Sequence, residues 1–288
     1  MGSGGAPGTG GAAMCSACTA YGTPMMTGHV VPTALANLSG IAVSWKNANV
    51  LFAHNDMTQA HVFALDPAGQ QLGRYALPNA GAVDIEDMAI GPCAAAGGTC
   101  IFLADIGGNL GARSEFAIFR LAEPQVPATP STATTQVTFE RFPFTYPDGQ
   151  HNAEGLLVEP RSGAIYIVTK VAAGMPSAVY ALPNPLGATG NMARKVADLP
   201  VPKSGDSPAT SASAHPCGLG FLLRTSERVY EFRIAAGAAF ETAFAATPVM
   251  VSSATEPQSE AISYQPDGRG YFSSGETAAA PIFHVLCQ

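Results

Sequence analysis

One hairpin pattern recurs five times along the chain and restricts it to a small set of folds. In the clearest copy an acidic segment leads into an apolar run at 83–90, and a second apolar run at 101–106 ends in a Gly-rich segment. The other copies pair residues 38–43 with 50–56, 152–158 with 164–170, 210–212 with 220–225, and 259–264 with 270–274. A spacing of roughly 50 residues is typical of repeat architectures built from one supersecondary unit.

Two further β-like runs follow most of these hairpins, and Pro-rich joints such as 123–127 and 182–185 interrupt any helix between them. Units of four short antiparallel strands repeated radially form a β-propeller. We therefore predict an all-β, five-bladed propeller, with six blades as the alternative if residues 122–146 contain another unit. The last repeat has only three strands, so a strand near 28–33 is expected to complete it and close the ring.

Composition supports one folded domain. The chain has 288 residues, of which 47% are hydrophobic, and we assign 21–288 to a single propeller and 1–20 to a flexible Gly/Ala/Ser-rich linker. Fourteen basic residues stand against 21 acidic ones without a Lys/Arg cluster, which argues against a nucleic-acid partner. No apolar run reaches the ~18 residues of a membrane span, so we expect no transmembrane segment. The first residues also lack the pattern of a leader peptide, and we expect none in this chain.

Six cysteines, an even number, favour an oxidising environment. Cys93 and Cys100 flank the turn of a predicted hairpin, where two cysteines can approach within disulfide distance, and we predict that they are bridged. A zinc site at Cys15 and Cys18 is the competing interpretation, but the sequence has no second close pair of cysteines to complete the four ligands. The remaining four allow three pairings that the sequence leaves open: Cys15, Cys18, Cys217 and Cys287. We therefore expect an extracytoplasmic protein, either secreted or surface-tethered.

Propeller geometry predicts where the polar residues meet. The start of each innermost strand and the end of the second strand lie at the same end of the central channel. This placement gathers acidic side chains that we predict as metal ligands: Asp56, Glu86, Asp105, Glu154 and Glu260. It also brings candidate ligand-binding residues to the same end, together with Glu276: His54, Asn55, Lys170 and Arg224.

Carboxylates held close together repel, so they must be protonated, paired with cations or neutralised by a metal. A hard cation with oxygen ligands is one solution, and a set of this size suggests Ca²⁺. The alternative is a structural ion-pair network in which Lys170 and Arg224 neutralise the glutamates. Direct catalysis by the carboxylates is a third interpretation. No Gly-x-Ser-x-Gly elbow, phosphate-binding loop or His-Glu-x-x-His helix is present.

Several short motifs carry a resemblance to known proteins. They are 38–40, 54–56, 84–87, 105–109, 146–149 with 153–154, 169–170, 224–225 and 259–261. From about residue 38 onward the chain resembles an uncharacterised family of bacterial secreted β-propeller proteins, and it is more distantly similar to esterase-like phytase and gluconolactonase-type propellers. The resemblance implies a propeller fold outside the cytoplasm, a linker like those of lipid-anchored proteins, and Ca²⁺ in the channel. Gly108 and Ser226 depart from the nearer relatives, which have an acidic and an aromatic residue there.

Two functional hypotheses follow. The first is a cation-dependent hydrolase of ester, lactone or phosphoester substrates, with the metal as Lewis acid or water activator. The second is a non-catalytic extracellular module that binds a small-molecule ligand or an extracellular protein at the same end of the channel. Function on a propeller has to be argued from its site and not from its fold.

Overall fold

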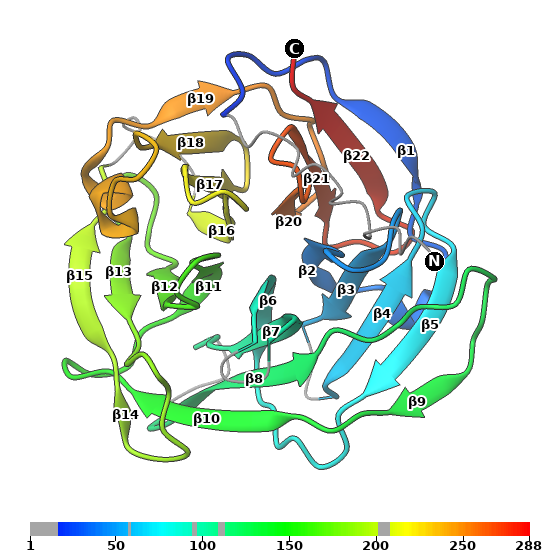
Figure 1. Cartoon of the computed structure of the whole chain (residues 1–288), viewed down its shortest axis with the longest axis horizontal. Helices are drawn as coiled ribbons and strands as arrows, with labels where there is room; N and C mark the ends of the chain where they lie inside the picture. The colour runs from blue at the N-terminus through cyan, green and yellow to red at the C-terminus, as the bar shows by residue number, and fades with distance from the viewer. Residues whose placement is uncertain (1–16, 57–58, 94–96, 109–112, 201–207) are drawn as a thin grey trace, which may run out of the picture.

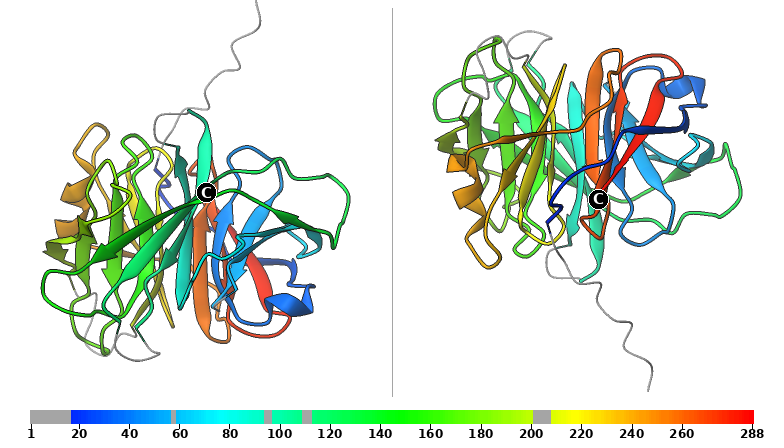
Figure 2. Two further views of the ribbon diagram at one scale, coloured as in Figure 1. Left: turned by 90° about the horizontal axis from the view of Figure 1, so that it is seen from below. Right: turned by 90° about the horizontal axis from the view of Figure 1, so that it is seen from above.

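The computed structural model describes residues 17–56, 59–93, 97–108, 113–200 and 208–288. Five sheets surround a central channel, with β2, β6, β11, β16 and β20 innermost (Figure 1), and the prediction of a five-bladed β-propeller is confirmed. Seen from the edge, the blades stand side by side in a thick disc (Figure 2). No helix in the described part of the chain is long and apolar enough to span a membrane.

The blades follow the order of the chain. Blade 1 contains β2 (Leu38–Val43), β3 (Leu51–Asn55), β4 (His61–Leu65) and β5 (Gln71–Ala76). Blade 2 contains β6 (Ile85–Pro92), β7 (Thr99–Asp105), β8 (Phe116–Ala122) and β10 (Glu140–Thr145). Blade 3 contains β11 (Ala153–Val158), β12 (Ile165–Thr169), β13 (Ala178–Ala181) and β15 (Arg194–Asp198). Blade 4 contains β16 (Ala209–Ala214), β17 (Gly220–Thr225), β18 (Val229–Arg233) and β19 (Val249–Val251). Blade 5 contains β20 (Ser259–Tyr264), β21 (Gly270–Gly275), β22 (Pro281–Leu286) and β1 (Met25–His29).

Two short strands cross from one blade to its neighbour. β9 (Thr134–Gln136) pairs in parallel with β5, and β14 (Asn191–Met192) pairs in parallel with β10. The segment 122–146 therefore contributes β9 to blade 1 and β10 to blade 2, and it contains no sixth blade. A short 3-10 helix, η2 (Phe240–Ala245), occupies part of the Ala-rich run between β18 and β19.

The chain closes its ring at blade 5. β1 pairs antiparallel with β22, so the predicted closure by an N-terminal strand is confirmed, although the strand begins at Met25 and ends at His29. A disulfide between Cys18 and Cys287 joins the segments on either side of this pairing. The predicted Cys93–Cys100 disulfide is also present. Cys217 is disulfide-bonded, whereas Cys15 and residues 1–16 of the expected linker lie outside the described residues.

The hydrophobic core lies between the blades. Within the described residues, five apolar clusters form, one at each contact between neighbouring sheets. Phe119 packs at the contact of blades 1 and 2, Tyr180 at that of blades 2 and 3, and Phe221 at that of blades 3 and 4. Each sheet is buried on both faces, and the inner strands are therefore rich in apolar residues, although β16 and β20 also contain buried serines.

Candidate metal centre

Each innermost strand carries a β-bulge at its second residue. In all five, one residue has no opposite number in the register with the second strand: Ser39, Glu86, Glu154, Thr210 and Glu260. A bulge turns its extra residue out of the regular alternation and re-aims the side chain. The repeat thus places one polar residue per blade at the same end of the channel, which we call the mouth.

Three of these bulge residues are glutamates, and loops add three further carboxyl groups. Charge interactions connect the six side chains with one another or with Lys170, and we call this set the acidic mouth: Asp56, Asp84, Glu86, Glu154, Glu260 and Glu276. It has two layers. Asp84, Glu86 and Glu154 are buried, with 3%, 4% and 3% exposure, whereas Asp56, Glu260 and Glu276 are partly exposed.

Within the acidic mouth, two buried carboxylates and one partly exposed carboxylate have the spacing of a metal site. One oxygen each from Asp56, Asp84 and Glu86 lies within 4.8 Å of the others. Asp84 Oδ2 and Glu86 Oε1 are buried and have no hydrogen-bond partner. A Cβ atom at Gly107 would lie 2.2 Å from each of these two oxygens, so only glycine leaves the space beside them open. Buried oxygens without partners are costly, and a cation would satisfy them.

The electrostatics agree with this interpretation. Burial, together with neighbouring carboxylates such as Glu154, raises the pKa of Glu86 to about 10. Burial raises the pKa of Glu260 to about 8, and that of Asp56 to about 7. A divalent cation can replace the protons that such groups otherwise retain, because metal ligands bind in their deprotonated form.

Lys170 is the cation that the chain itself places in the mouth. Its Nζ donates to both carboxylate oxygens of Glu154 at 2.6 Å. Burial opposes its charged form, but Glu154, and then Glu260 and Glu86, outweigh that effect and raise its pKa. Lys170 is therefore an ammonium group that forms an ion pair with Glu154, whereas no ion pair among the described residues involves Asp56, Asp84 or Glu86.

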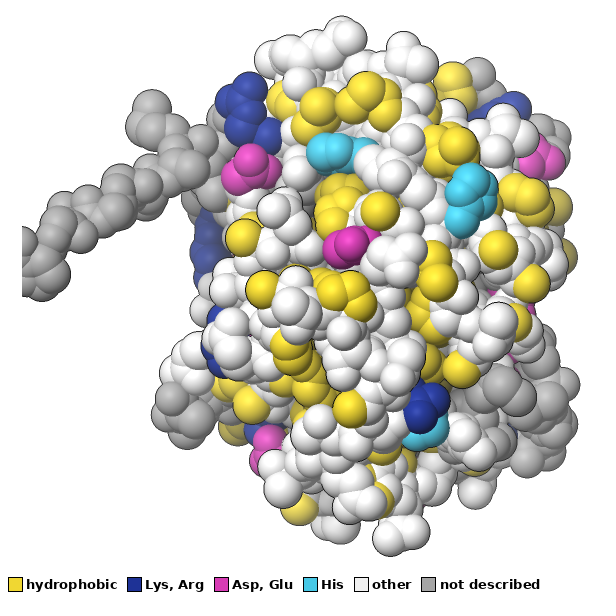
Figure 3. All heavy atoms as spheres, turned by 90° about the vertical axis from the view of Figure 1, so that its right-hand side faces the viewer, with side chains coloured by type: hydrophobic (Ala, Val, Ile, Leu, Met, Phe, Trp, Pro, Cys, Tyr) yellow, Lys and Arg dark blue, Asp and Glu magenta, His cyan; other side chains and the backbone are white. Residues whose placement is uncertain are grey.

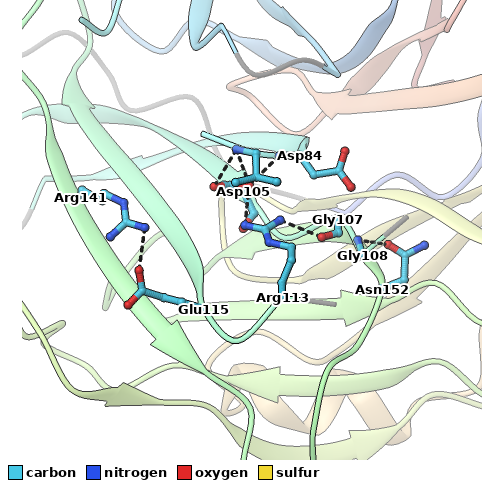
Figure 4. A network of polar contacts seen from close by, with 9 residues as sticks. Asp84, Asp105, Gly107, Gly108, Arg113, Glu115, Arg141 and Asn152 are labelled. Atoms are coloured by element: carbon cyan, nitrogen blue, oxygen red, sulfur yellow. Dashed lines mark hydrogen bonds and ion pairs between the residues drawn. The ribbon is translucent and has the colours of Figure 1, made fainter. Parts of the chain in front are cut away.

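Asp105 lies beside this centre but contacts another partner. Its carboxylate accepts the backbone N–H of Asp84 at 2.8 Å and forms an ion pair with Arg113 at 2.8 Å (Figure 4). Arg113 also donates to the carbonyl of Gly107 at 2.8 Å. Asp105 and Arg113 thus hold Asp84 and Gly107 in place, and Asp105 is not in the group of three carboxylates whose oxygens approach one another.

Of the predicted binding residues, Lys170 is the one that the contacts of the described residues connect with the acidic mouth. Arg224 is fully buried in an ion pair with Glu256 at 3.1 Å. The side-chain amide of Asn55 donates to the carbonyl of Ala34 and accepts the backbone N–H of Asn37. His54 is 1% exposed, with Nδ1 3.0 Å from the carbonyl of Asn55. Burial lowers its pKa to about 4, so the ring is neutral.

Below the acidic mouth, Asp87 closes the channel. Its Oδ2 accepts the backbone N–H of Leu156 at 2.7 Å and of Ala212 at 3.2 Å, and Oδ1 accepts the hydroxyl of Ser211 at 3.0 Å. Beyond it, side chains from all five blades line a cavity of about 20 Å³, which holds little more than a water molecule.

Asp84 and Gly107 are the residues that sequence reasoning did not assign to the site. Asp84 lies one residue before the start of β6. The sequence pattern that could have identified it is the pair of acidic residues that it forms with Glu86, two positions later. Gly107 follows the second strand of the same blade. Comparison with protein-family models finds no match to this chain, and comparison with curated proteins finds none either, so the function is argued from this geometry.

Proposed function

We propose that the protein is a divalent-cation-binding β-propeller that works outside the cytoplasm and holds Ca²⁺ with Asp56, Asp84 and Glu86. The observation that carries the proposal is the pair of buried oxygens, Asp84 Oδ2 and Glu86 Oε1, which have no hydrogen-bond partner and face a space that Gly107 keeps open. Carboxylate oxygens are the ligands that Ca²⁺ prefers. The two disulfides support the location, since such bonds persist in oxidising compartments.

The activity that suits this site is metal-assisted hydrolysis of an ester or lactone. A bound cation would act there as a Lewis acid toward a carbonyl oxygen. The chain supplies the remaining parts: Asp87 closes the channel below the site, and Lys170 holds the Glu154 carboxylate. Glu260, partly exposed and with a pKa near 8, has the proton affinity of a general base or acid.

The second candidate is a non-catalytic module that uses the same cation to bind a small ligand. It is favoured by His54, whose ring is buried and neutral beside Gly40, because a catalytic histidine has to reach the bound ligand. Turnover of generic esters, lactones and phosphoesters, measured with and without Ca²⁺, separates the two candidates. Hydrolysis that chelator abolishes supports the enzyme, and no turnover by Ca²⁺-loaded protein supports the binding module.

Cation binding itself is tested by calorimetric titration of chelator-treated protein with Ca²⁺. We expect saturable binding by the wild-type protein and none by Asp84→Asn or Glu86→Gln, because each amide keeps the shape of the side chain and removes a charged ligand. The matched control is Asp267→Asn, which removes one charge at the β20–β21 turn, at the opposite end of the channel. A flat trace for the wild-type protein would contradict cation binding and favour the alternative, in which the carboxylates belong to a structural ion-pair network.

Gly107→Ala tests the geometry without changing any charge. Its methyl group would occupy the position 2.2 Å from Asp84 Oδ2 and Glu86 Oε1, so we expect Ca²⁺ affinity to fall by roughly tenfold or more. Gly22→Ala is the control, since its Cβ meets no atom closer than 3.4 Å. Equal Ca²⁺ affinities of the two variants would contradict the proposed position of the cation.

A further inference from the structure

A cavity lies at the end of the disc opposite the mouth, where blade 5 meets blade 1. Its volume is about 330 Å³, and residues of the β2–β3, β4–β5 and β20–β21 turns line it together with β1 and β22. Small-molecule sites usually have roughly 300–1,000 Å³. Val43, Leu51 and Phe272 contribute buried apolar side chains from the cluster between the two blades. None of the described lining residues belongs to the acidic mouth, so the cavity is a separate candidate site.

Two stacked rings line this cavity, and one of them carries an unsatisfied nitrogen. The ring centroids of Phe272 and His284 are 4.2 Å apart, and the ring planes lie within 2° of each other. Nε2 of His284 is buried and has no hydrogen-bond partner. Burial lowers the pKa of His284, although Asp267 opposes that shift, so the imidazole is neutral near pH 7. A buried polar atom without a partner is costly, and a ligand in the cavity can supply the missing hydrogen bond.

The cavity offers no counter-charge to an ion. Among the described residues that line it, none is Asp, Glu, Lys or Arg. The amide of Asn47 is bonded within the chain, since Oδ1 accepts the backbone N–H of Val126 at 3.0 Å and Nδ2 donates to the carbonyl of Pro124 at 3.0 Å. The outer wall beside the cavity, at β1 and β5, also carries few acidic or basic side chains among apolar and neutral polar ones (Figure 3). A charged ligand would therefore lose its hydration without gaining an ionic partner.

We propose that this cavity binds a small uncharged aromatic compound that carries a hydroxyl group. The aromatic ring would pack among Val43, Leu51 and Phe272, because aromatic rings gain from ring contacts as well as from burial. The hydroxyl would bond with Nε2 of His284. A hydroxyl both donates and accepts, so it serves whichever tautomer the imidazole adopts. The inference goes beyond the proposed function, since this ligand binds at the other end of the channel and needs no cation.

Three probes with the same naphthalene ring test the proposal: 2-naphthylmethanol, which is uncharged, 2-naphthoate, which is an anion, and 2-naphthylmethylamine, which is a cation near pH 7. Each is titrated calorimetrically into the wild-type protein at fixed pH and ionic strength. We expect the alcohol to bind roughly tenfold or more tightly than either ion, because an ion loses hydration without a counter-charge. Either ion binding as tightly as the alcohol, or no binding by the alcohol, would overturn the proposal.

Variants then locate the bound alcohol. His284→Phe keeps an aromatic ring and removes Nε2, so we expect 2-naphthylmethanol to bind roughly fivefold more weakly. Ala48→Phe should abolish binding, because Ala48 is an exposed lining residue and the larger side chain would fill the opening. Ala236→Phe is the matched control at an exposed turn outside the cavity, and Asp84→Asn, which alters the metal centre, should also keep binding. Binding that survives Ala48→Phe, that His284→Phe leaves unchanged, or that Asp84→Asn abolishes refutes the proposal.

Discussion

The double variant Cys18→Ser/Cys287→Ser is expected to lose as much as about 5 kcal/mol of unfolding free energy through the greater freedom of its unfolded chain. The two cysteines are 269 positions apart, so their bond closes nearly the whole chain into one loop. A cross-link removes more entropy from the unfolded state when the loop that it closes is longer. The native contacts at this seam include the pairing of β1 with β22 and a bridge at Tyr21, and the disulfide adds a covalent link beside them.

The second described disulfide supplies the control. Cys93 and Cys100 are only 7 positions apart, and the same entropy relation gives about 2.5 kcal/mol for the Cys93→Ser/Cys100→Ser variant. Melting temperatures from calorimetry, and denaturant midpoints, should rank the wild-type protein above this control and the control above the Cys18/Cys287 variant. Equal loss in both variants would show that the long loop gives no extra stability.

The fold was predictable from sequence because its repeats are local. Each inner hairpin is marked in the sequence by two apolar runs around a turn such as 266–268. Its two strands pair antiparallel with each other, so their pairing can be predicted from this local segment alone. β9 and β14 were not predictable in this way. They are three and two residues long and pair in parallel with strands of another blade, so no local pattern marks their partners.

The site was predictable only in part, for a related reason. Glu86, Glu154 and Glu260 share one position in the repeat, and the common bulge turns all three toward the mouth. Asp105 and Arg224 occupy equivalent strand ends, yet their directions are set by single distant partners, Arg113 and Glu256, which the repeat does not specify. Sequence spacing therefore gives the end of the channel at which a residue lies, and tertiary contacts decide what its side chain meets.

Asp87→Ala is the second substitution expected to have a large effect, here through lost hydrogen bonds at the centre of the ring. The carboxyl group of Asp87 is fully buried, and burial raises its pKa well above the ordinary value even though four hydrogen bonds oppose that shift. Three of those bonds join blade 2 to blades 3 and 4 through the backbone N–H groups of Leu156 and Ala212 and the hydroxyl of Ser211, and the fourth comes from the backbone N–H of Met88. Alanine would leave these donors buried without an acceptor, at about 1–3 kcal/mol for each group.

We therefore expect Asp87→Ala to lose about 3 kcal/mol or more of unfolding free energy, measured by denaturant unfolding of the chelator-treated protein. Ser211→Ala is the graded control, because it removes one of the same bonds and leaves Asp87 its backbone donors, and it should cost about 1 kcal/mol. If the two variants were equally stable, the bonds across the channel would contribute little and the apolar contacts between blades would hold the ring by themselves. A clear difference would show that Asp87 joins the blades through hydrogen bonds that reach Leu156, Ala212 and Ser211.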